Sequence, residues 1–421
     1  PDALCAGGKD DGCFSGGAFV DDDGTAYLTF WIYNRNKTDL GSDAGIAIAS
    51  SQPPYDMWTR QSSVAIPSTA WGIREKNGVP LGCADPSNIW KSDGKYYMLT
   101  GNLCVLNQFG RTADSPRHLR GDWTELFVSE DLERWIYQGR FYQRAEDNRW
   151  TDETEDNMCP ATYPLPVLAR GGQTSGEYIQ LFISHNKGCQ YYIGGLKQER
   201  FVPRLHGRMS WTDNAFFAPE AYLDGKGRLI MFAWLKDNLP DDFETYGWSG
   251  VQSLPRVLWR GGDGTLRLCA APETDALAYD CRVLHGRQIH GETILPEADT
   301  QAGRIRLRMS GENMGVYIGS KDACVSVYYN HGESVLVMDA SSGGLLGKRF
   351  IEQAPLALED GEPLELTVYL DHAVVECFAN QRQAISRRVY FPADSEAAVS
   401  VIGKGMLHWG EVSKMAPCMP Y

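Results

Sequence analysis

The chain is a succession of short apolar runs rich in Tyr, Phe, Ile, Val and Trp, each bounded by Gly, Asp or Asn. We find no long stretch with clean helical periodicity, and short runs of this composition are typical of β-strands. Four of the runs share one plan, in which a polar turn with a glycine opens an apolar strand: 22–30, 92–100, 175–183 and 225–233.

This repeat predicts the architecture of the first part of the chain. A looser copy lies at 262–268, and segments 55–58 and 129–135 each end in Trp, so we expect outer strands that end on a packing Trp. Four-stranded units repeated radially form a β-propeller, whose functional loops converge at one end of a central channel. We therefore predict propeller blades over residues 1–275.

The pattern changes after Pro272. Apolar and polar residues alternate strictly at 304–309, 325–329 and 364–370. A period of two fits antiparallel strands with one face in water, and so predicts a β-sandwich over 300–421. The expected fold class is all-β, with a linker at about 272–300.

The charge balance narrows the classes of partner. The formal net charge is −14, so nucleic-acid backbones and anionic membrane surfaces would be repelled overall, and a neutral substrate fits better. The sequence contains no apolar run long enough to span a membrane and no recognisable signal peptide. Twelve Trp and twenty Tyr could in part stack on sugar rings, although core packing accounts for most of them.

The eleven cysteines form no Cys-x-x-Cys pair and have no His cluster beside them. This argues against a zinc site and against a disulfide framework. Scattered, reduced cysteines favour a reducing, cytoplasmic setting. Because the chain begins with Pro1 rather than Met, an upstream segment and secretion stay open.

The stretch from Asp152 to Pro166 organises the candidate chemistry. It places Glu153, Glu155 and Asp156 ahead of a Cys-Pro pair, at the start of an apolar run. From composition alone this would be a solvated acidic loop, because charge runs usually face water.

Other motifs along the chain change that interpretation. Five segments occur in a fixed order: Phe-Ser-Gly-Gly-Ala at 14–18, Cys-Ala-Asp-Pro at 83–86, Phe-Ala-Pro-Glu at 217–220, Ser-Leu-Pro-Arg at 253–256 and Val-Val-Glu-Cys-Phe-Ala-Asn at 374–380. Together they resemble glycoside hydrolase family 32, the invertases, fructanases and fructosyltransferases. The resemblance covers essentially the whole chain and implies a five-bladed β-propeller that carries the active site, followed by a C-terminal β-sandwich.

Three departures from the family pattern matter. The Asn-Asp-Pro motif that carries the family's nucleophile is absent, so we interpret the chain as truncated upstream of Pro1, with an incomplete first blade. Ala84 stands where the family usually has Arg, and Met158 stands where it has the acid/base Glu. A divergent bacterial branch is similar in moving the carboxylate upstream, as in Glu155-Asp156-x-x-Cys159-Pro160, and also resembles this chain at 183–185, 188–189, 191–194 and 206–211.

The resemblance implies a retaining mechanism with two carboxyl groups about 5–5.5 Å apart. We expect Glu155 to be the acid/base, since Glu153 and Asp156 beside it would help to keep it protonated, and Glu220 is the next candidate. Asp85 would hold the hydroxyls of the fructosyl ring in the transition state, although an Asp-Pro turn is its structural alternative.

The remaining predicted site residues are expected to bind substrate, and several have structural alternatives. Trp31 fits a core position equally well, His206 and Arg208 fit a structural role, and Glu220 could instead pair with Arg208. The expected substrate-binding set is Phe14, Ser15, Trp31, Cys159, His206, Arg208 and Glu220.

Three functions follow as hypotheses. The first is a retaining hydrolase of β-fructofuranosyl linkages in sucrose, fructo-oligosaccharides or fructans such as levan and inulin. The second is a fructosyltransferase on the same scaffold, and the third is a carbohydrate-binding propeller without catalysis. The mechanism needs no metal or cofactor. The sequence identifies neither the particular fructoside nor the oligomeric state, and an incomplete propeller with unpaired edges would be inactive or poorly stable.

Overall fold

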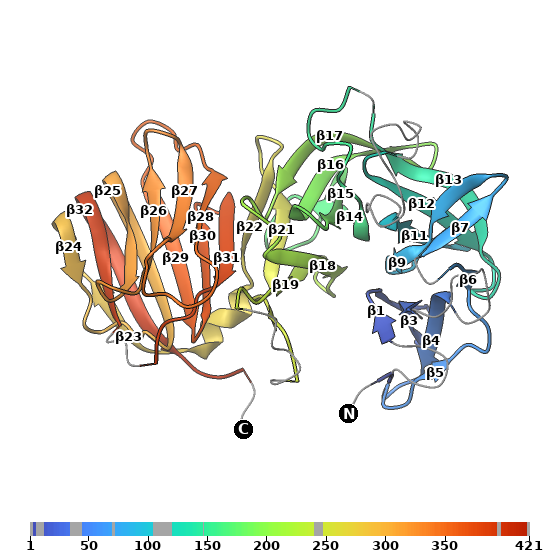
Figure 1. The fold of residues 1–421 in the computed structure, drawn as a ribbon, viewed down its shortest axis with the longest axis horizontal. Helices are drawn as coiled ribbons and strands as arrows, with labels where there is room; N and C mark the ends of the chain where they lie inside the picture. Colours follow the sequence, from blue (N-terminus) through green and yellow to red (C-terminus); the bar gives the residue numbers. More distant parts are fainter. Residues whose placement is uncertain are drawn as a thin grey trace. The chain divides into compact units, whose positions relative to one another are not determined.

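The computed structural model describes residues 3–5, 12–33, 44–69, 72–103, 120–145, 147–239, 247–393 and 397–418. Their regular secondary structure is almost entirely β-strand, and it includes the 3-10 helix η4 at Pro272–Leu277 (Figure 1). Within this part of the chain the cysteines are not joined in disulfides, and Cys104 lies outside it. No helix in it is long and apolar enough to cross a membrane.

The first half of the chain forms sheets of the blade type. The first sheet has the order β1-β3-β4-β5, with β2 on β3 and β6 on β4, and a separate hairpin, β7-β8, follows it. Their bounds are β1 (Gly12–Phe14), β2 (Ala18–Val20), β3 (Ala26–Tyr33), β4 (Gly45–Ser51), β5 (Thr59–Arg60), β6 (Ile66–Pro67), β7 (Ile73–Lys76) and β8 (Val79–Gly82).

Three more sheets repeat the plan, with the orders β10-β11-β12-β13 (β9 on β11), β14-β15-β16-β17 and β18-β19-β21-β22 (β20 on β19). Their bounds are β9 (Ala84–Pro86), β10 (Trp90–Ser92), β11 (Lys95–Gly101), β12 (Trp123–Ser129), β13 (Ile136–Gln143), β14 (Met158–Pro166), β15 (Thr174–Ser184), β16 (Gly188–Lys197), β17 (Arg200–Arg208), β18 (Phe216–Leu223), β19 (Leu229–Leu235), β20 (Val251–Gln252), β21 (Arg256–Arg260) and β22 (Leu266–Ala270).

The repeat seen in the sequence corresponds to one position in these sheets. Strands β3, β11, β15 and β19 carry the four copies, and each is second in the order of its sheet. The turn glycines Gly24, Gly94, Gly176 and Gly227 all have φ between 73° and 84°, a region that L-residues rarely adopt. The predicted all-β class is confirmed. The described residues contain four blade sheets. In the first of them four strands, β1, β3, β4 and β5, are hydrogen-bonded in succession.

Two local predictions need correction. Segment 129–135 is not a strand but the turn between β12 and β13, because Asp131 Oδ1 accepts the backbone N–H groups of Glu133 and Arg134 and closes the chain on itself. Trp135 in this turn is buried, as expected for a packing Trp. Segment 55–58 is not a strand either, because β4 ends at Ser51 and β5 begins at Thr59. The looser copy of the repeat at 262–268 does open an apolar strand, β22, as its pattern indicates.

A backbone feature recurs in the second, third and fourth sheets. Asp85, Cys159 and Ala218 have φ values of 41°, 49° and 44°, and each precedes a proline in the first strand of its sheet. Non-glycine residues seldom occupy this left-handed region, at a cost of about 1–3 kcal/mol each. In β9 the conformation coincides with a break in register opposite Thr100 and Gly101, so Asp85 is the extra residue of a β-bulge.

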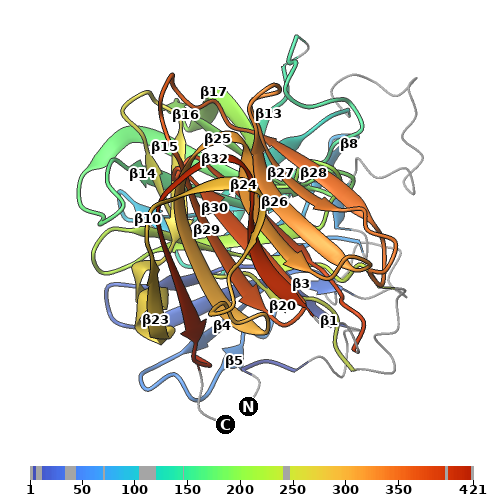
Figure 2. The same cartoon turned by 90° about the vertical axis from the view of Figure 1, so that its left-hand side faces the viewer.

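The C-terminal part forms a ten-stranded antiparallel sheet. Its two longest strands, β25 and β32, lie side by side over most of their length (Figures 1 and 2). Strand bounds are β23 (Ala278–Leu284), β24 (Arg287–Ile294), β25 (Ala302–Gly319), β26 (Cys324–Asn330), β27 (Val335–Ala340), β28 (Phe350–Pro355), β29 (Leu364–Asp371), β30 (Val374–Ala379), β31 (Gln383–Arg388) and β32 (Ala398–Met415).

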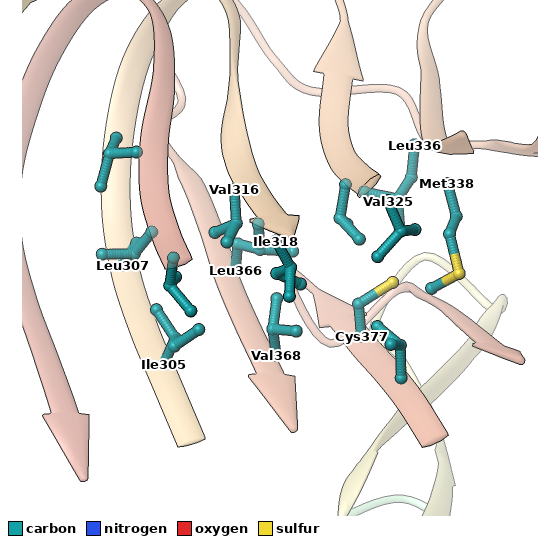
Figure 3. Packing of buried hydrophobic residues seen from close by; sticks show 14 of the residues in the cluster. Ile305, Leu307, Val316, Ile318, Val325, Leu336, Met338, Leu366, Val368 and Cys377 are labelled. Carbon is teal, nitrogen blue, oxygen red and sulfur yellow. The ribbon is translucent and has the colours of Figure 1, made fainter. Parts of the chain in front are cut away.

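The period-two pattern places the core of this part as predicted. Ile305 and Leu307 on β25 and Leu366 and Val368 on β29 are almost fully buried, and Figure 3 shows their side chains within one apolar cluster. The interval 272–300 is not a linker, because β24 pairs with β32 from Arg287 to Ile294.

Contacts divide the chain into two compact units. One contains residues 1–164, 176–208 and 218–220, and the other contains 165–175, 209–217 and 221–421. The first three blade sheets therefore lie essentially in the first unit. All the candidate site residues named above also belong to the first unit.

Candidate active site

Asp85 and Cys159 are in direct contact, although 74 residues separate them in the chain. The Cys159 thiol donates to Asp85 Oδ2 at 3.2 Å, and both side chains are buried. Burial raises the pKa of Asp85 above its usual value, while the Cys159 thiol and the charge of His185 act in the opposite direction. The left-handed turns before Pro86 and Pro160 thus present a carboxyl group and a thiol to each other.

The first sheet contributes the next neighbours. Ser15 Oγ lies 3.6 Å from Cys159 Sγ. Phe14 is 48% exposed, and its ring centroid lies 5.6 Å from that of Trp31. Trp31 is only 5% exposed, so the core alternative fits it better than an open stacking surface. Phe14 is the aromatic side chain of this pair that solvent can reach.

Glu155 does not lie in a solvated loop, because only 1% of the residue is exposed. Its carboxylate accepts from Arg208 Nη2 at 3.0 Å, Gln190 Nε2 at 2.7 Å, Ser184 Oγ at 3.2 Å and the backbone N–H of Asp152 at 3.1 Å. Both oxygens are therefore occupied by donors, one of them a guanidinium.

The register of the strands explains why these donors lie together around Glu155. Gln190 on β16 is the Cα partner of Arg208 on β17, so the two side chains lie on the same face of the third sheet. Ser184 is the last residue of β15 and pairs with Gly188 at the start of β16. The ends of three neighbouring strands thus meet at Glu155.

His206 lies behind this network. Its Nε2–H donates to Gln190 Oε1 at 2.8 Å, and its ring stacks on Trp150 with centroids 6.3 Å apart. Burial, followed by the positive charge of Arg208, lowers the pKa of His206 to about 3. The imidazole is neutral at physiological pH, and its contacts are structural. Arg208 forms an ion pair with Glu155, with Nη2 3.0 Å from Oε1.

Asp156, next in the chain, binds His185. Its Oδ2 lies 2.5 Å from His185 Nδ1, and its Oδ1 accepts the backbone N–H of His185 at 2.7 Å. Asp156 is 1% exposed, whereas the His185 side chain is 37% exposed. A buried carboxylate therefore fixes the orientation of a partly exposed imidazole.

Met158 and Ala84, the two residues that differ from those usual in the family, are both buried in packed surroundings. Met158 is 1% exposed and lies against Gly101, where an added Cβ would come within 2.9 Å of Met158 Sδ. Ala84 is fully buried, and a Cβ on Gly72 would come within 2.4 Å of its own Cβ. Neither position provides a polar group.

Two further acidic residues lie near the site. Glu220 on β18 is half-buried, and after burial its negative charge is the other cause that raises the pKa of Tyr163. Asp122 is fully buried, accepts from Thr151 Oγ1 at 2.7 Å and Tyr192 OH at 2.9 Å, and has a pKa raised by burial to about 6. Among the described residues, no group of three or more His, Cys, Asp or Glu side chains is arranged to hold a metal ion.

The structure therefore brings the predicted residues into two neighbouring groups. Asp85, Cys159 and Ser15 form one, and Glu155, Arg208 and His206 form the other. Sequence reasoning gave no role to Ser184, His185 and Gln190. The only signal for Ser184 and His185 was that 183–185 stands among the segments that resemble the divergent branch, and Gln190 lies in none of those segments.

Comparison with known proteins extends these observations to the whole chain. The model of the glycosyl hydrolases family 32 N-terminal domain matches residues 3–272, and that of the family 32 C-terminal domain matches 276–412. The chain is 26% identical to raffinose invertase of Escherichia coli over 417 residues, which cover 93% of this chain and 78% of that protein. It is 25% identical to sucrose-6-phosphate hydrolase of Bacillus subtilis over 418 residues, with 95% and 78% covered.

Solved structures agree on the fold. A variant of fructan 1-exohydrolase IIa from Cichorium intybus, in complex with 1-kestose, superposes with a TM-score of 0.77 at 18% identity. The match covers 97% of this chain and 85% of that chain. At this identity the similarity establishes the propeller-and-sandwich architecture.

Proposed function

Because the chain belongs to glycosyl hydrolase family 32, we propose that the protein hydrolyses β-fructofuranosidic bonds in sucrose or in fructans. The observation that supports this most directly is the buried Asp85 carboxyl group, held by a left-handed turn against Cys159. The names of the relatives, an invertase and a sucrose-6-phosphate hydrolase, agree in substrate class.

In this proposal Asp85 binds hydroxyl groups of the fructosyl ring. A hydrogen bond that strengthens as the ring flattens toward an oxocarbenium-like state lowers the barrier, and it does so most effectively from a site that excludes water. Ser15 and the exposed Phe14 are the neighbours that would contact the same sugar.

The assignment of Glu155 as acid/base stays a prediction. Its four donors include Arg208, and replacing the carboxylate would leave that guanidinium without its ion-pair partner. Glu155→Gln is therefore expected to lower activity on every fructoside. The loss by itself would not identify a proton-transfer role.

The experiment is an assay of fructose release from sucrose, inulin and levan by the full-length protein, with any segment encoded before Pro1. We expect release from at least one of them, and Asp85→Asn should lower kcat about 100-fold or more with an unchanged melting temperature. Asp93→Asn, the same change at an exposed turn, is the matched control.

Two results would contradict the proposal. Saturable binding of fructosides without any release would favour a carbohydrate-binding propeller. Products longer than the substrate, formed in preference to free fructose, would favour fructosyl transfer over hydrolysis.

A further inference from the structure

The solvent-facing side of the C-terminal sheet carries a row of three side chains that differ in chemistry. Arg308 on β25 is the Cα partner both of Trp409 on β32 and of Glu365 on β29. Side chains of directly paired residues lie on the same face of a sheet. Because neighbouring strands are about 4.8 Å apart, the row extends about 10 Å across the three strands.

The row is exposed, while the other face of the same strands packs in the core. The exposed fractions are 41% for Trp409 and 55% and 57% for the side chains of Arg308 and Glu365. Leu307 and Leu366, each next to a row residue in the chain, are 3% and 1% exposed. Both leucines lie in the apolar cluster of Figure 3. The row is therefore open to a ligand and is not part of the core.

A β-bulge at this point changes the direction of side chains on β32. Arg308 pairs with Trp409, whereas the next residue of β25, Met309, pairs with Leu407. His408 is thus the extra residue of the bulge. In a regular strand consecutive side chains alternate between the two faces, but His408 and Trp409 are both exposed. The bulge turns two consecutive side chains toward solvent, and one of them is an indole.

The row lines a groove of about 360 Å³, together with Arg306 and Thr367. Arg308 Nε lies 3.9 Å from Glu365 Oε1, and an exposed ion pair of this length contributes little to stability. Arg306 forms its own ion pair with Asp275. The charges named here balance, so an anionic ligand would gain little from the two guanidinium groups and would be repelled by the carboxylates.

These groups match the chemistry of a neutral sugar chain. The flat apolar face of an indole can pack against the C–H face of a sugar ring. A guanidinium donates to one hydroxyl group, and the carboxylate beside it accepts from the next. Sites for small ligands typically combine aromatic surface with a few polar groups that fix the orientation.

We propose that the groove at Trp409, Arg308 and Glu365 binds a stretch of fructan chain outside the active site. The choice of fructan as the sugar rests on the function proposed above. The groove belongs to the second compact unit, whereas the candidate active-site residues belong to the first. A polymer bound by this groove stays at a high effective concentration near the enzyme, although the groove takes no part in breaking the glycosidic bond.

The first test measures binding without turnover. Full-length protein that carries Asp85→Asn, which leaves the polymer intact, migrates through native gels containing levan, inulin or dextran. We expect levan or inulin to retard it. Adding Trp409→Ala should weaken the apparent dissociation constant about tenfold, and adding Arg308→Gln should weaken it in the same direction. Trp409→Phe keeps a flat ring and should weaken it about threefold or less.

The second test uses the enzyme with an intact active site. Trp409→Ala should raise KM on levan or inulin about tenfold with an unchanged kcat. Both constants on sucrose should stay at the wild-type values, because a disaccharide in the active site gains nothing from a second binding surface. Tyr279→Ala is the matched control, since Tyr279 is a 52% exposed aromatic residue on β23 of the same sheet. It should match the wild-type protein in both tests.

Four outcomes would overturn the inference. These are unchanged retardation and KM in folded Trp409→Ala, equal changes on sucrose and fructan, and retardation by dextran as strong as by the fructans. The fourth is a change in sedimentation with unchanged fructan binding, because the face would then join two copies of the chain. Melting temperatures identify a variant that fails to fold, and Trp409→Phe and Arg308→Gln then decide.

The failure of the proposed function gives a different result. If the wild-type protein releases no fructose but is retarded by fructan through Trp409, the hydrolase proposal has failed and the binding surface stands. If it releases fructose and Trp409→Ala changes neither retardation nor KM, the hydrolase proposal stands and this inference has failed.

Discussion

At the residue scale, His206 shows how burial turns a titratable side chain into a structural one. Its pKa of about 3, against an ordinary 6.5, means that the folded protein does not protonate His206 where the unfolded chain does. The unfolded state therefore binds more protons between about pH 6.5 and 3. The stability that this group contributes is complete above pH 6.5 and is lost as the pH falls through that interval.

We therefore expect His206→Gln to make the protein less sensitive to acid. The wild-type free energy of unfolding should fall by up to about 1.4 kcal/mol more per pH unit than that of the variant below pH 6.5. Urea unfolding of both proteins at pH 7.5 and pH 4.5 measures this. Parallel losses in the two proteins would contradict the assignment.

The comparison with the variant is necessary because Asp122 changes the stability of the protein with pH in the direction opposite to His206. Its pKa of about 6 is raised above the unfolded value, so its contribution is present below about pH 4 and is lost as the pH rises through 6. In the wild-type protein the two groups partly cancel between pH 4 and 6. A pH profile of the wild-type protein alone would therefore hide both.

At the element scale, the strands of the blades could be predicted from the sequence and the site could not be predicted in full. The glycine turn followed by an apolar run identified β3, β11, β15 and β19, because both the turn conformation and the burial are local properties. The interval 272–300 was misassigned because strands β23 and β24 are largely exposed and carry little apolar signal.

The site depends on strand register, which local sequence does not determine. Glu155 was identified through its motif, but its partners come from the Gln190–Arg208 pairing and from the end of β15. The contact between Asp156 and His185 likewise requires the β15–β16 turn to fold back on the acidic loop. The prediction that neighbouring negative charge surrounds Glu155 missed Arg208 for this reason.

Gly17 lies where residues next to the strands of the first sheet contact the segment that follows Asp85. Its N–H donates to Thr29 Oγ1 at 2.9 Å, and the same hydroxyl donates to the carbonyl of Ser87 at 2.8 Å, two residues after Asp85. A Cβ at Gly17 would come within 2.4 Å of the backbone nitrogen of Asn88. Backbone on both sides leaves no room for a side chain.

Gly17→Ala should therefore destabilise the protein by about 3 kcal/mol and lower kcat, because the segment that carries Asp85 has to shift. Gly195→Ala on β16, where the space is open, is the control and should change neither quantity strongly. Thermal unfolding and fructose release measure the two effects. A Gly17→Ala protein with wild-type stability and turnover would show that this contact does not position Asp85.

At the scale of the whole molecule, a buried ion pair joins the last blade sheet to the C-terminal sheet within the second unit. Arg256 on β21 is fully buried, and its Nη2 lies 3.4 Å from Glu376 Oε2 and 2.6 Å from Ser386 Oγ. Glu376 Oε1 also accepts the backbone N–H of Leu254 at 2.7 Å. Glu376 thus has a structural role in this unit.

Removing one partner should leave an uncompensated buried charge. Glu376→Gln is expected to lower the free energy of unfolding by about 3–5 kcal/mol, whereas the double change to Arg256→Met with Glu376→Leu should recover much of the loss. Glu365→Gln, at an exposed carboxylate, is the control. If Glu376→Gln unfolds at the wild-type urea concentration, the pair does not stabilise this part of the chain.

The left-handed residue before proline gives Asp85, Cys159 and Ala218 the same backbone at the start of three sheets. The side chain differs in each, a carboxyl group, a thiol and a methyl group, while the backbone is unchanged. Chemistry at these positions can therefore vary by point substitution without redesign of the strands that carry them. Of the three positions, only Ala218 carries no group that could bind or react.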